Sequence, residues 1–154
     1  MKNAFTMIEL IYVIVILGVL SAVALPKFGG IRNQADISKA RTDVAAIRSS
    51  IMTERQSQLI KGNNTDPYIP QLSSSTTTLF TGNGGRALLA YGIVSGIGTG
   101  EWAVVTNAAS NSYTFTVDAT AVQFDYNTTT GNFSCDRGGV SPTTAQENCR
   151  SIID

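Results

Sequence analysis

Hydrophobic residues are distributed very unevenly along the chain. Residues 5–25 read FTMIELIYVIVILGVLSAVAL, a segment in which Glu9 is the single charged residue. At 1.5 Å per residue, a helix of this length extends about 30 Å, which is the thickness of the hydrocarbon core of a bilayer. Apolar side chains would cover every side of this helix. The pattern therefore predicts a membrane-spanning helix rather than an amphipathic surface helix.

The pattern changes at Pro26. Pro26 has no backbone N–H and is expected to kink the helix there. Apolar residues then recur at spacings of three and four, which predicts an amphipathic helix over residues 26–61. The stripe consists of Ile37, Ala40, Val44, Ile47 and Ile51. We expect its second half to pack against the C-terminal part of the same chain.

Residues 62–154 predict a small head domain. Three segments, residues 102–106, 113–117 and 122–126, are alternating or β-rich, and a short strand is expected at Phe133. Residues 86–91 predict a short helix, and the glycine-rich residues 92–100 predict a loop. The expected fold class is α+β, with a long N-terminal α-helix packed on a small antiparallel β-sheet.

Charge is also distributed unevenly, although the net charge is zero. Residues 27–61 contain seven basic and three acidic residues, whereas residues 62–154 contain three basic and seven acidic residues. Opposite charges could guide the stacking of one copy on another, or they could form two ordinary solvated faces. The spacing of Lys39 and Asp43 predicts an ion pair on the outer surface of the helix.

No residue pattern predicts catalysis. The chain has no histidine, which is the commonest general base and metal ligand. It also lacks G-x-S-x-G and S-x-x-K motifs, and the glycines at 96, 98 and 100 lack the spacing of a dinucleotide site. We therefore expect a protein that is not an enzyme, with no catalytic residue, no cofactor, no metal and no nucleic-acid partner.

Two further features lie near the end of the chain. Cys135 and Cys149 enclose thirteen residues, a spacing that fits no zinc or redox motif. In an oxidising exterior they are expected to form a disulfide, worth roughly 3 kcal/mol in the chain-entropy model. Asn127, in the sequence DYNTT, matches both the simple N-x-S/T acceptor and a stricter acidic form, and is a candidate glycosylation site.

Three interpretations of the apolar segment compete. It could be a plain membrane anchor, or a secretory signal peptide cut after Ala22-Val23-Ala24. Neither explains Glu9, because a carboxylate within a bilayer costs roughly 2.5–3.5 kcal/mol on insertion scales. A cut between Ala4 and Phe5 would create a cationic amine one helical turn from Glu9. That amine could neutralise the carboxylate within one chain or between neighbouring chains.

The segment Ala4-Phe5-Thr6-Met7-Ile8-Glu9 resembles the processing site of type IV pilins and type II secretion pseudopilins, and the resemblance continues over about the first 55 residues. It implies a leader of residues 1–4, cut by a prepilin peptidase between Ala4 and Phe5, and N-methylation of Phe5. Residues 5–25 would be the transmembrane and assembly helix, with Glu9 acting in filament assembly. Ala4 stands where this family usually has glycine.

The resemblance further implies the arrangement and partners of the whole chain. Residues 26–61 would complete the rod, and residues 62–154 would form an extracytoplasmic head with a C-terminal disulfide loop. The partners would be further copies in a helical filament, the membrane, the peptidase and an inner-membrane assembly platform. The subunit would cross the inner membrane once and then enter a periplasmic or cell-surface filament.

The sequence leaves several functions open. It does not separate a type IV pilus from a type II secretion pseudopilus, although the disulfide loop favours a pilus. A minor pilin of a DNA-uptake system is an alternative, if Arg137 and Arg150 form a local basic patch. A membrane-anchored exported protein of other function is a further alternative.

Overall fold

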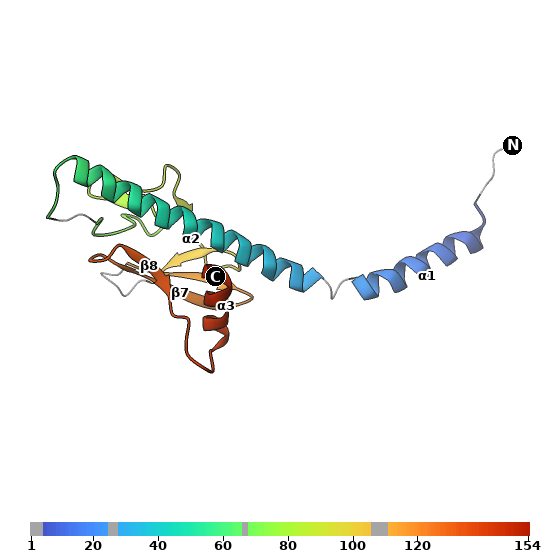
Figure 1. Cartoon of the computed structure of the whole chain (residues 1–154). Helices are drawn as coiled ribbons and strands as arrows, with labels where there is room; N and C mark the ends of the chain where they lie inside the picture. The colour runs from blue at the N-terminus through green and yellow to red at the C-terminus, as the bar shows by residue number, and fades with distance from the viewer. Residues whose placement is uncertain (1–4, 25–27, 66–67, 106–110) are drawn as a thin grey trace. The chain divides into compact units, whose positions relative to one another are not determined.

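The structure is a computed structural model that describes residues 5–24, 28–65, 68–105 and 111–154 (Figure 1). Pro26 and Ala4 lie outside the described residues. The fold is α+β, as the sequence predicts: a long apolar N-terminal helix is followed by a second helix and antiparallel sheets. The chain divides into two compact units between Ala35 and Asp36, and each unit is described separately below.

The first helix, α1, covers Met7–Ala24 and buries none of its residues. Its side chains are apolar on every side, so no face is specified for packing against a head domain. Among the described residues, α1 is the one helix that is long enough and apolar enough to cross a membrane, judged by length and composition.

The second helix, α2, covers Phe28–Ile60. Ala40, Val44, Ile47 and Ile51 are almost completely buried, so the predicted stripe forms one side of the head's hydrophobic core. Gly62 follows the end of the helix and has a φ of +82°. The amide of Gly62 donates to the carbonyl of Leu59, and that of Asn63 donates to the carbonyl of Gln58. These two bonds form a Schellman motif, which glycine favours because it has no side chain to strain at positive φ.

A four-stranded antiparallel sheet forms the other side of this core (Figure 1). Its strands are β5 (Trp102–Val104), β6 (Ser112–Val117), β7 (Thr120–Asn127) and β8 (Asn132–Cys135), in that order across the sheet. The register pairs Trp102 with Phe115 and Tyr126 with Phe133. Residues that alternate along β6 and β7 are buried, as the period of two in a strand requires.

The centre of the head is aromatic. Phe80 and Tyr113 have ring centroids 4.5 Å apart, and Phe124 stacks on Phe133 at 5.4 Å. Trp102 contacts four of the surrounding rings and is fully buried. Each such ring pair contributes about 0.5–1.5 kcal/mol beyond the burial of its area. A small domain thereby gains stability from few residues.

Two short antiparallel strand pairs correct the sequence prediction between residues 78 and 100. β1 (Thr78–Leu79) pairs with β4 (Ile93–Val94), and β2 (Gly82–Asn83) pairs with β3 (Arg86–Ala87). The predicted helix over residues 86–91 is therefore wrong. Gly84 and Gly85 both have positive φ values, 62° and 76°. They form the two-residue turn that reverses the chain, so Arg86 starts a strand.

The C-terminal helix α3 (Thr144–Ile153) was not predicted. Its signal is a capping box, Thr143-x-x-Gln146, in which Thr143 Oγ1 accepts from the Gln146 amide and Gln146 Oε1 accepts from the Thr143 amide. Cys149 and Ile152 are its buried residues, so the helix covers one margin of the core.

Candidate functional site

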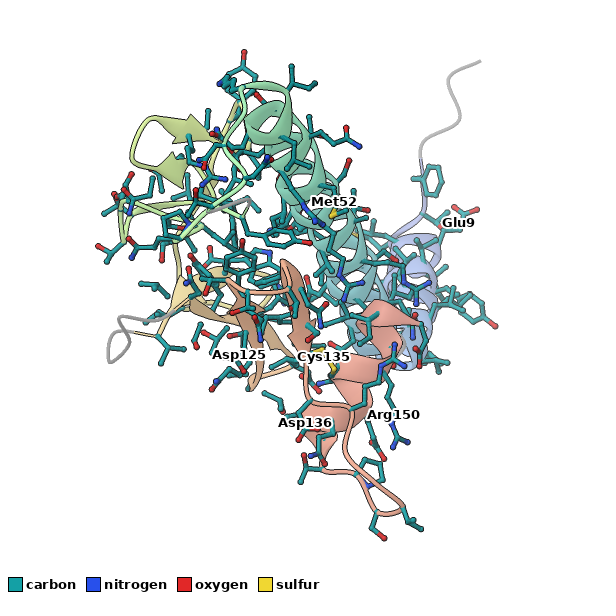
Figure 2. All side chains as sticks on the ribbon, turned by 60° about the vertical axis from the view of Figure 1, so that its left-hand side comes forward. Glu9, Met52, Asp125, Cys135, Asp136 and Arg150 are labelled. Carbon is teal, nitrogen blue, oxygen red and sulfur yellow. A yellow bond between two sulfur atoms is a disulfide. The ribbon has the colours of Figure 1, made fainter. Side chains whose placement is uncertain are left out.

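Glu9 takes part in a local hydrogen-bond arrangement at the start of α1 (Figure 2). Its carboxylate accepts from the amide of Thr6 at 2.9 Å and from the hydroxyl of Thr6 at 2.9 Å. The Glu9 amide in turn donates to Thr6 Oγ1 at 3.3 Å. Thr6-x-x-Glu9 is therefore a capping box, which places a negative charge at the positive end of the helix dipole. The same four-residue pattern is visible in the sequence and is a signal from which this cap could be predicted.

The surface around Glu9 is otherwise apolar and open. Phe5, Ile8, Tyr12 and Val13 line a shallow groove beside the carboxylate. Phe5 is 80% exposed, and the other apolar side chains of α1 are exposed as well. Residues 5–24 include no basic residue that could pair with Glu9. A cation for this carboxylate must therefore come from a terminal amine, from elsewhere in the chain or from another molecule.

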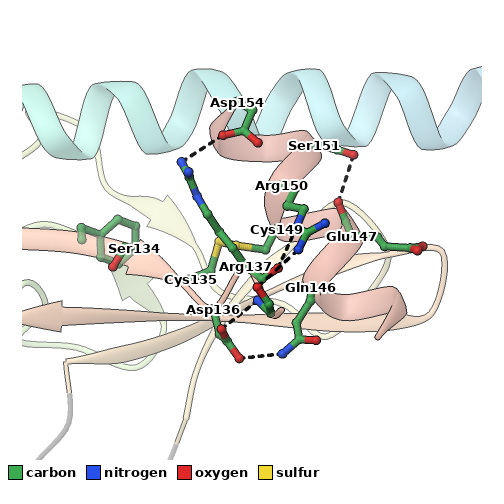
Figure 3. Close-up of a disulfide and its surroundings, with 12 residues drawn as sticks. Ser134, Cys135, Asp136, Arg137, Gln146, Glu147, Cys149, Arg150, Ser151 and Asp154 are labelled. Carbon is green, nitrogen blue, oxygen red and sulfur yellow. Dashed lines mark hydrogen bonds and ion pairs between the residues drawn. A yellow bond between two sulfur atoms is a disulfide. The ribbon is translucent and has the colours of Figure 1, made fainter. Parts of the chain in front are cut away.

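The disulfide joins Cys135, at the end of β8, to Cys149, inside α3 (Figure 3). Asp136 lies next to it and accepts from the amide of Gly138 at 2.9 Å and from Gln146 Nε2 at 2.7 Å. The backbone bond from Gly138, together with the bond from Gln146, lowers the pKa of Asp136. The loop thus has polar connections to α3 in addition to the covalent one.

Arg150 and Arg137 also make contacts around the disulfide loop. Arg150 Nε donates to the carbonyl of Arg137 at 2.8 Å, and its Nη2 donates to the carbonyl of Gly139 at 2.7 Å. Arg137 forms an ion pair with Asp154 at 2.9 Å (Figure 3). Both guanidinium groups bind atoms of their own domain, which does not favour the basic patch that nucleic-acid binding would require.

Asn127 is the last residue of β7 and is exposed. Its Oδ1 accepts from the amides of Thr129 at 2.9 Å and Thr130 at 3.1 Å. The asparagine thereby closes the turn that leads into β8. Its glycosylation stays a prediction from the sequon.

From Lys39 onwards, the charged side chains of α2 turn towards the head, although the sequence predicted an outer surface for Lys39 and Asp43. Lys39 Nζ donates to the carbonyl of Gly100 at 2.5 Å, and Trp102 Nε1 donates to Asp43 Oδ2 at 2.9 Å. The predicted outer ion pair between Lys39 and Asp43 is therefore wrong, because each residue has a partner in the head. The buried stripe packs α2 against the head. Polar side chains next to the stripe, such as Lys39 and Asp43, are then close enough to bind strands and loops of the head.

Three more basic residues of α2 bind the head, two of them through backbone carbonyls. Arg41 Nη2 donates to the carbonyl of Ser151 at 2.5 Å, and Arg48 Nε donates to the carbonyl of Phe133 at 2.9 Å. Arg55 stacks on the ring of Tyr68 and donates to its hydroxyl. Much of the positive charge on α2 thus lies against the acidic head of the same subunit.

Glu54 continues the buried side of α2 with a charged residue. It is 6% exposed and accepts from Arg86 Nε at 2.7 Å and from Arg86 Nη2 at 2.5 Å. Gln58 also donates to it at 2.7 Å. Burial by itself raises the pKa of Glu54, but the bonds from Arg86 and Gln58 and the charge of Arg86 outweigh burial, so its pKa lies below 4.5. The ion pair fixes β3 to α2.

The glycine-rich segment has no open cradle for a phosphate. The carboxylate of Glu101 accepts from the Gly98 amide at 2.7 Å and occupies the space beside Gly96 and Gly98. A negative group therefore fills the position that an anion would need. Among the described residues, no group of three or more His, Cys, Asp or Glu side chains could hold a metal ion.

Comparisons with known proteins identify related chains. The chain is 31% identical to a fimbrial protein of Moraxella nonliquefaciens over 103 residues, which cover 62% of this chain and 64% of that protein. It is 40% identical over 50 residues to the type II secretion system core protein G of Dickeya chrysanthemi, covering 32% of this chain and 33% of that protein. It is 46% identical over 48 residues to the type IV narrow pilus major component PilA5 of Thermus thermophilus. This match covers 31% of this chain and 41% of that protein.

These matches span less than two thirds of each relative's length. No family model matches the chain, and no solved structure matches it.

Proposed function

We propose that the chain is a member of the family of type IV pilins and type II secretion pseudopilins, and that it polymerises through α1 into a helical filament. The observation that carries this proposal is α1 itself, an 18-residue apolar helix with no buried residue and a single carboxylate. A membrane would cover the apolar side chains but would leave Glu9 without a partner. A neighbouring copy would cover the side chains and also supply a cation.

The proposed cation is the terminal amine of Phe5. Cleavage by a prepilin peptidase between Ala4 and Phe5, followed by N-methylation, would place a positive charge next to the Thr6 and Glu9 capping box. In a low-dielectric helix bundle the attraction between this amine and a neighbour's Glu9 is much stronger than in water. The subunit would wait in the inner membrane, with its head outside the cytoplasm, until an assembly platform adds it to the filament.

The match to the fimbrial protein favours a pilus over a pseudopilus. It covers 62% of the chain, which is longer than residues 1–61, so it includes part of the head. The matches to core protein G and PilA5 cover only about a third of the chain. The DNA-uptake alternative gains no support, because Arg137 and Arg150 are engaged within the head. Filaments on the cell surface would indicate a pilus, whereas loss of a secreted substrate on deletion would indicate a pseudopilus.

Replacement of Glu9 tests assembly directly. Glu9→Val should insert normally or better, since it removes a charge from the bilayer, but it should not polymerise. The loss follows because a buried amine without its partner costs about 3–5 kcal/mol per contact. Sheared filaments are counted against membrane level and leader cleavage, with Glu9→Asp, which keeps a carboxylate at this position, as the matched control. Undiminished assembly of Glu9→Val would show that this carboxylate does not dock subunits.

Processing is tested on the mature protein. Mass spectrometry of the N-terminal peptide should show a chain that begins at Phe5 with a monomethylated amine. A mature chain that begins at Leu25 would contradict the proposal, because α1 would have been removed.

A further inference from the structure

A polar cavity of about 1110 Å³ lies in the head, beside the turn that joins β7 to β8. Its walls come from the chain that follows α2, the turn between β2 and β3, the start of β6 and the end of β7. Pockets that hold small ligands have volumes of roughly 300–1,000 Å³. The cavity therefore has room for a ligand as large as a short oligosaccharide.

The side chains around this cavity are mostly uncharged groups that form hydrogen bonds. Arg86 is the one charged residue among the described residues that line it, and its charge is matched by Glu54. Asn83 Oδ1 and the hydroxyls of Thr65 and Thr128, on three of the lining residues, have no hydrogen-bond partner within the described parts of the chain. Amides and hydroxyls of this kind suit a neutral ligand that is rich in hydroxyl groups.

The side chain of Asn127 identifies one ligand of this chemistry. Asn127 lines the same cavity, is exposed and begins the N-x-T sequon that Thr129 completes. Its Oδ1 is held by the amides of Thr129 and Thr130, whereas its Nδ2 has no partner among the described residues. The nitrogen that an N-glycosidic bond uses is thus available, on a side chain whose other polar atom is fixed by the turn.

We propose that Asn127 carries an N-linked saccharide and that this saccharide lies in the adjoining cavity. The donor is a saccharide activated at its anomeric carbon as a diphosphate ester. Asn127 Nδ2 forms a bond to that carbon, the bond from the carbon to the diphosphate oxygen breaks, and the diphosphate leaves. One proton of the amide passes to a base of the transferring enzyme.

The covalent link explains how a shallow, neutral surface can hold a sugar. A tethered ligand has an effective concentration on the order of millimolar, so a weak contact suffices to keep it in place. A saccharide in this position would contact the β7–β8 turn, the β2–β3 turn and the chain after α2 together. The inference does not depend on the proposed function, since it needs no contact made by α1.

Mass spectrometry of the full-length protein extracted from its own cells tests the modification. Fragmentation of the peptide that contains Asn127 should place a saccharide mass on the asparagine. Asn127→Gln and Thr129→Ala should each lose this mass completely. Thr128→Ala is the matched control, because it alters the same turn and leaves the N-x-T pattern intact, and it should keep the mass. An unmodified Asn127 in the native protein, or a saccharide on a threonine hydroxyl instead, would overturn the proposal.

Hydrogen exchange tests the place of the saccharide. Full-length protein from its own cells is compared with the same chain made in a host that lacks the transferring enzyme. A saccharide that occupies the cavity about half of the time should slow exchange of the amides that it covers about twofold, at Thr65 and Gly84 on the cavity wall. The amides of α3 are the internal reference and should not change. Equal exchange at Thr65 and Gly84 in the two proteins would overturn the assignment of the cavity.

The outcomes separate this inference from the proposed function. Filaments built through α1 from subunits with an unmodified Asn127 would overturn the inference and leave the proposed function standing. A modified Asn127 in a protein that forms no filament would support the inference and overturn the proposed function.

Discussion

α1 and the part of α2 that begins at Asp36 are both helices, but they are stabilised by different surroundings. α1 has apolar residues on every side and buries none of them. α2 buries a narrow stripe against its own head and directs its charged residues to the same side. Under the proposed function, a membrane or other copies would cover the first helix. The second depends on the fold of its own subunit.

The difference implies that the two parts of the molecule respond separately to substitution. A change in α1 should alter assembly and leave the unfolding of the head unchanged. A change in the core of the head should alter unfolding before it affects membrane insertion.

The largest effect is expected from the aromatic core. Trp102→Ala should lower the free energy of unfolding of the head by about 4 kcal/mol, because it removes a large buried side chain and leaves a cavity. It also leaves Asp43 without the indole donor. Thermal unfolding followed by circular dichroism in detergent measures the change.

The matched change in the other helix is Leu17→Ala. Leu17 is 56% exposed in α1, so the unfolding temperature of the head should not move. A clear decrease would show that the head depends on α1 and would contradict the comparison.

The next effect concerns the buried ion pair. Glu54→Met should destabilise the head by about 3 kcal/mol, because the largely buried Arg86 guanidinium loses its carboxylate and keeps only backbone contacts such as the carbonyl of Tyr68. The double variant Glu54→Met/Arg86→Met should recover most of this loss, since both charges are then absent. Urea unfolding of the single and double variants gives the coupling energy between the two residues.

The pH dependence of unfolding tests the ion pair between Glu54 and Arg86 in a second way. The folded-state pKa of Glu54 is depressed, so its contribution is fully present above the ordinary value of 4.5 and is lost as pH falls through the lower, folded-state value. The unmodified head should therefore lose stability below about pH 4.5 more steeply than the double variant. Parallel titration curves for the two proteins would contradict this assignment.

A somewhat smaller effect is expected from the disulfide. Cys135→Ser/Cys149→Ser should lower the stability of the head by about 2–3 kcal/mol, because the unfolded chain regains the freedom of a short loop. The contacts of Arg150 and Asp136 with the loop should persist and limit the loss. Non-reducing peptide mapping first establishes the native linkage. Recovery of both residues as alkylated thiols from exported protein would contradict the pairing.

The smallest effect is expected at two helix caps, one at the start of α3 in the head and one at the start of α1. Thr143→Ala should cost the head about 1 kcal/mol, because it removes the acceptor for the amide of Gln146. Thr6→Ala removes the same kind of cap from α1 and should leave the unfolding of the head unchanged. A shift of the unfolding temperature of the head in Thr6→Ala would contradict the separation of the two units.

The fold class, the apolar stripe and the four-stranded sheet could be predicted from the sequence because each has a strong period. Ala40, Val44, Ile47 and Ile51 recur with the period of a helix, and Tyr113, Phe115 and Val117 alternate as in a strand. The start of α3 and the cap at Thr6 also have local signals in the sequence, the four-residue motifs Thr143-x-x-Gln146 and Thr6-x-x-Glu9. The helix expected over residues 86–91 was wrong because the preceding glycine pair dictates a turn.

The partners of charged residues could not be predicted in this way. Lys39 and Asp43 have the spacing of a surface pair, but their partners, Gly100 and Trp102, are about 60 residues further along the chain. Arg86 likewise binds Glu54 across 32 residues. Such contacts depend on how the sheet is placed against α2, and no local pattern in the sequence contains that information.

The polar contacts along α2 also bear on how the subunit would carry mechanical load. Lys39, Arg41, Arg48 and Glu54 attach successive parts of the helix to four separate segments of the head, at Gly100, Ser151, Phe133 and Arg86. A force that slides the head along the helix must strain these attachments together, whereas a force that peels the head away can break them one after another. Tension along the helix axis would therefore meet the stronger of the two resistances.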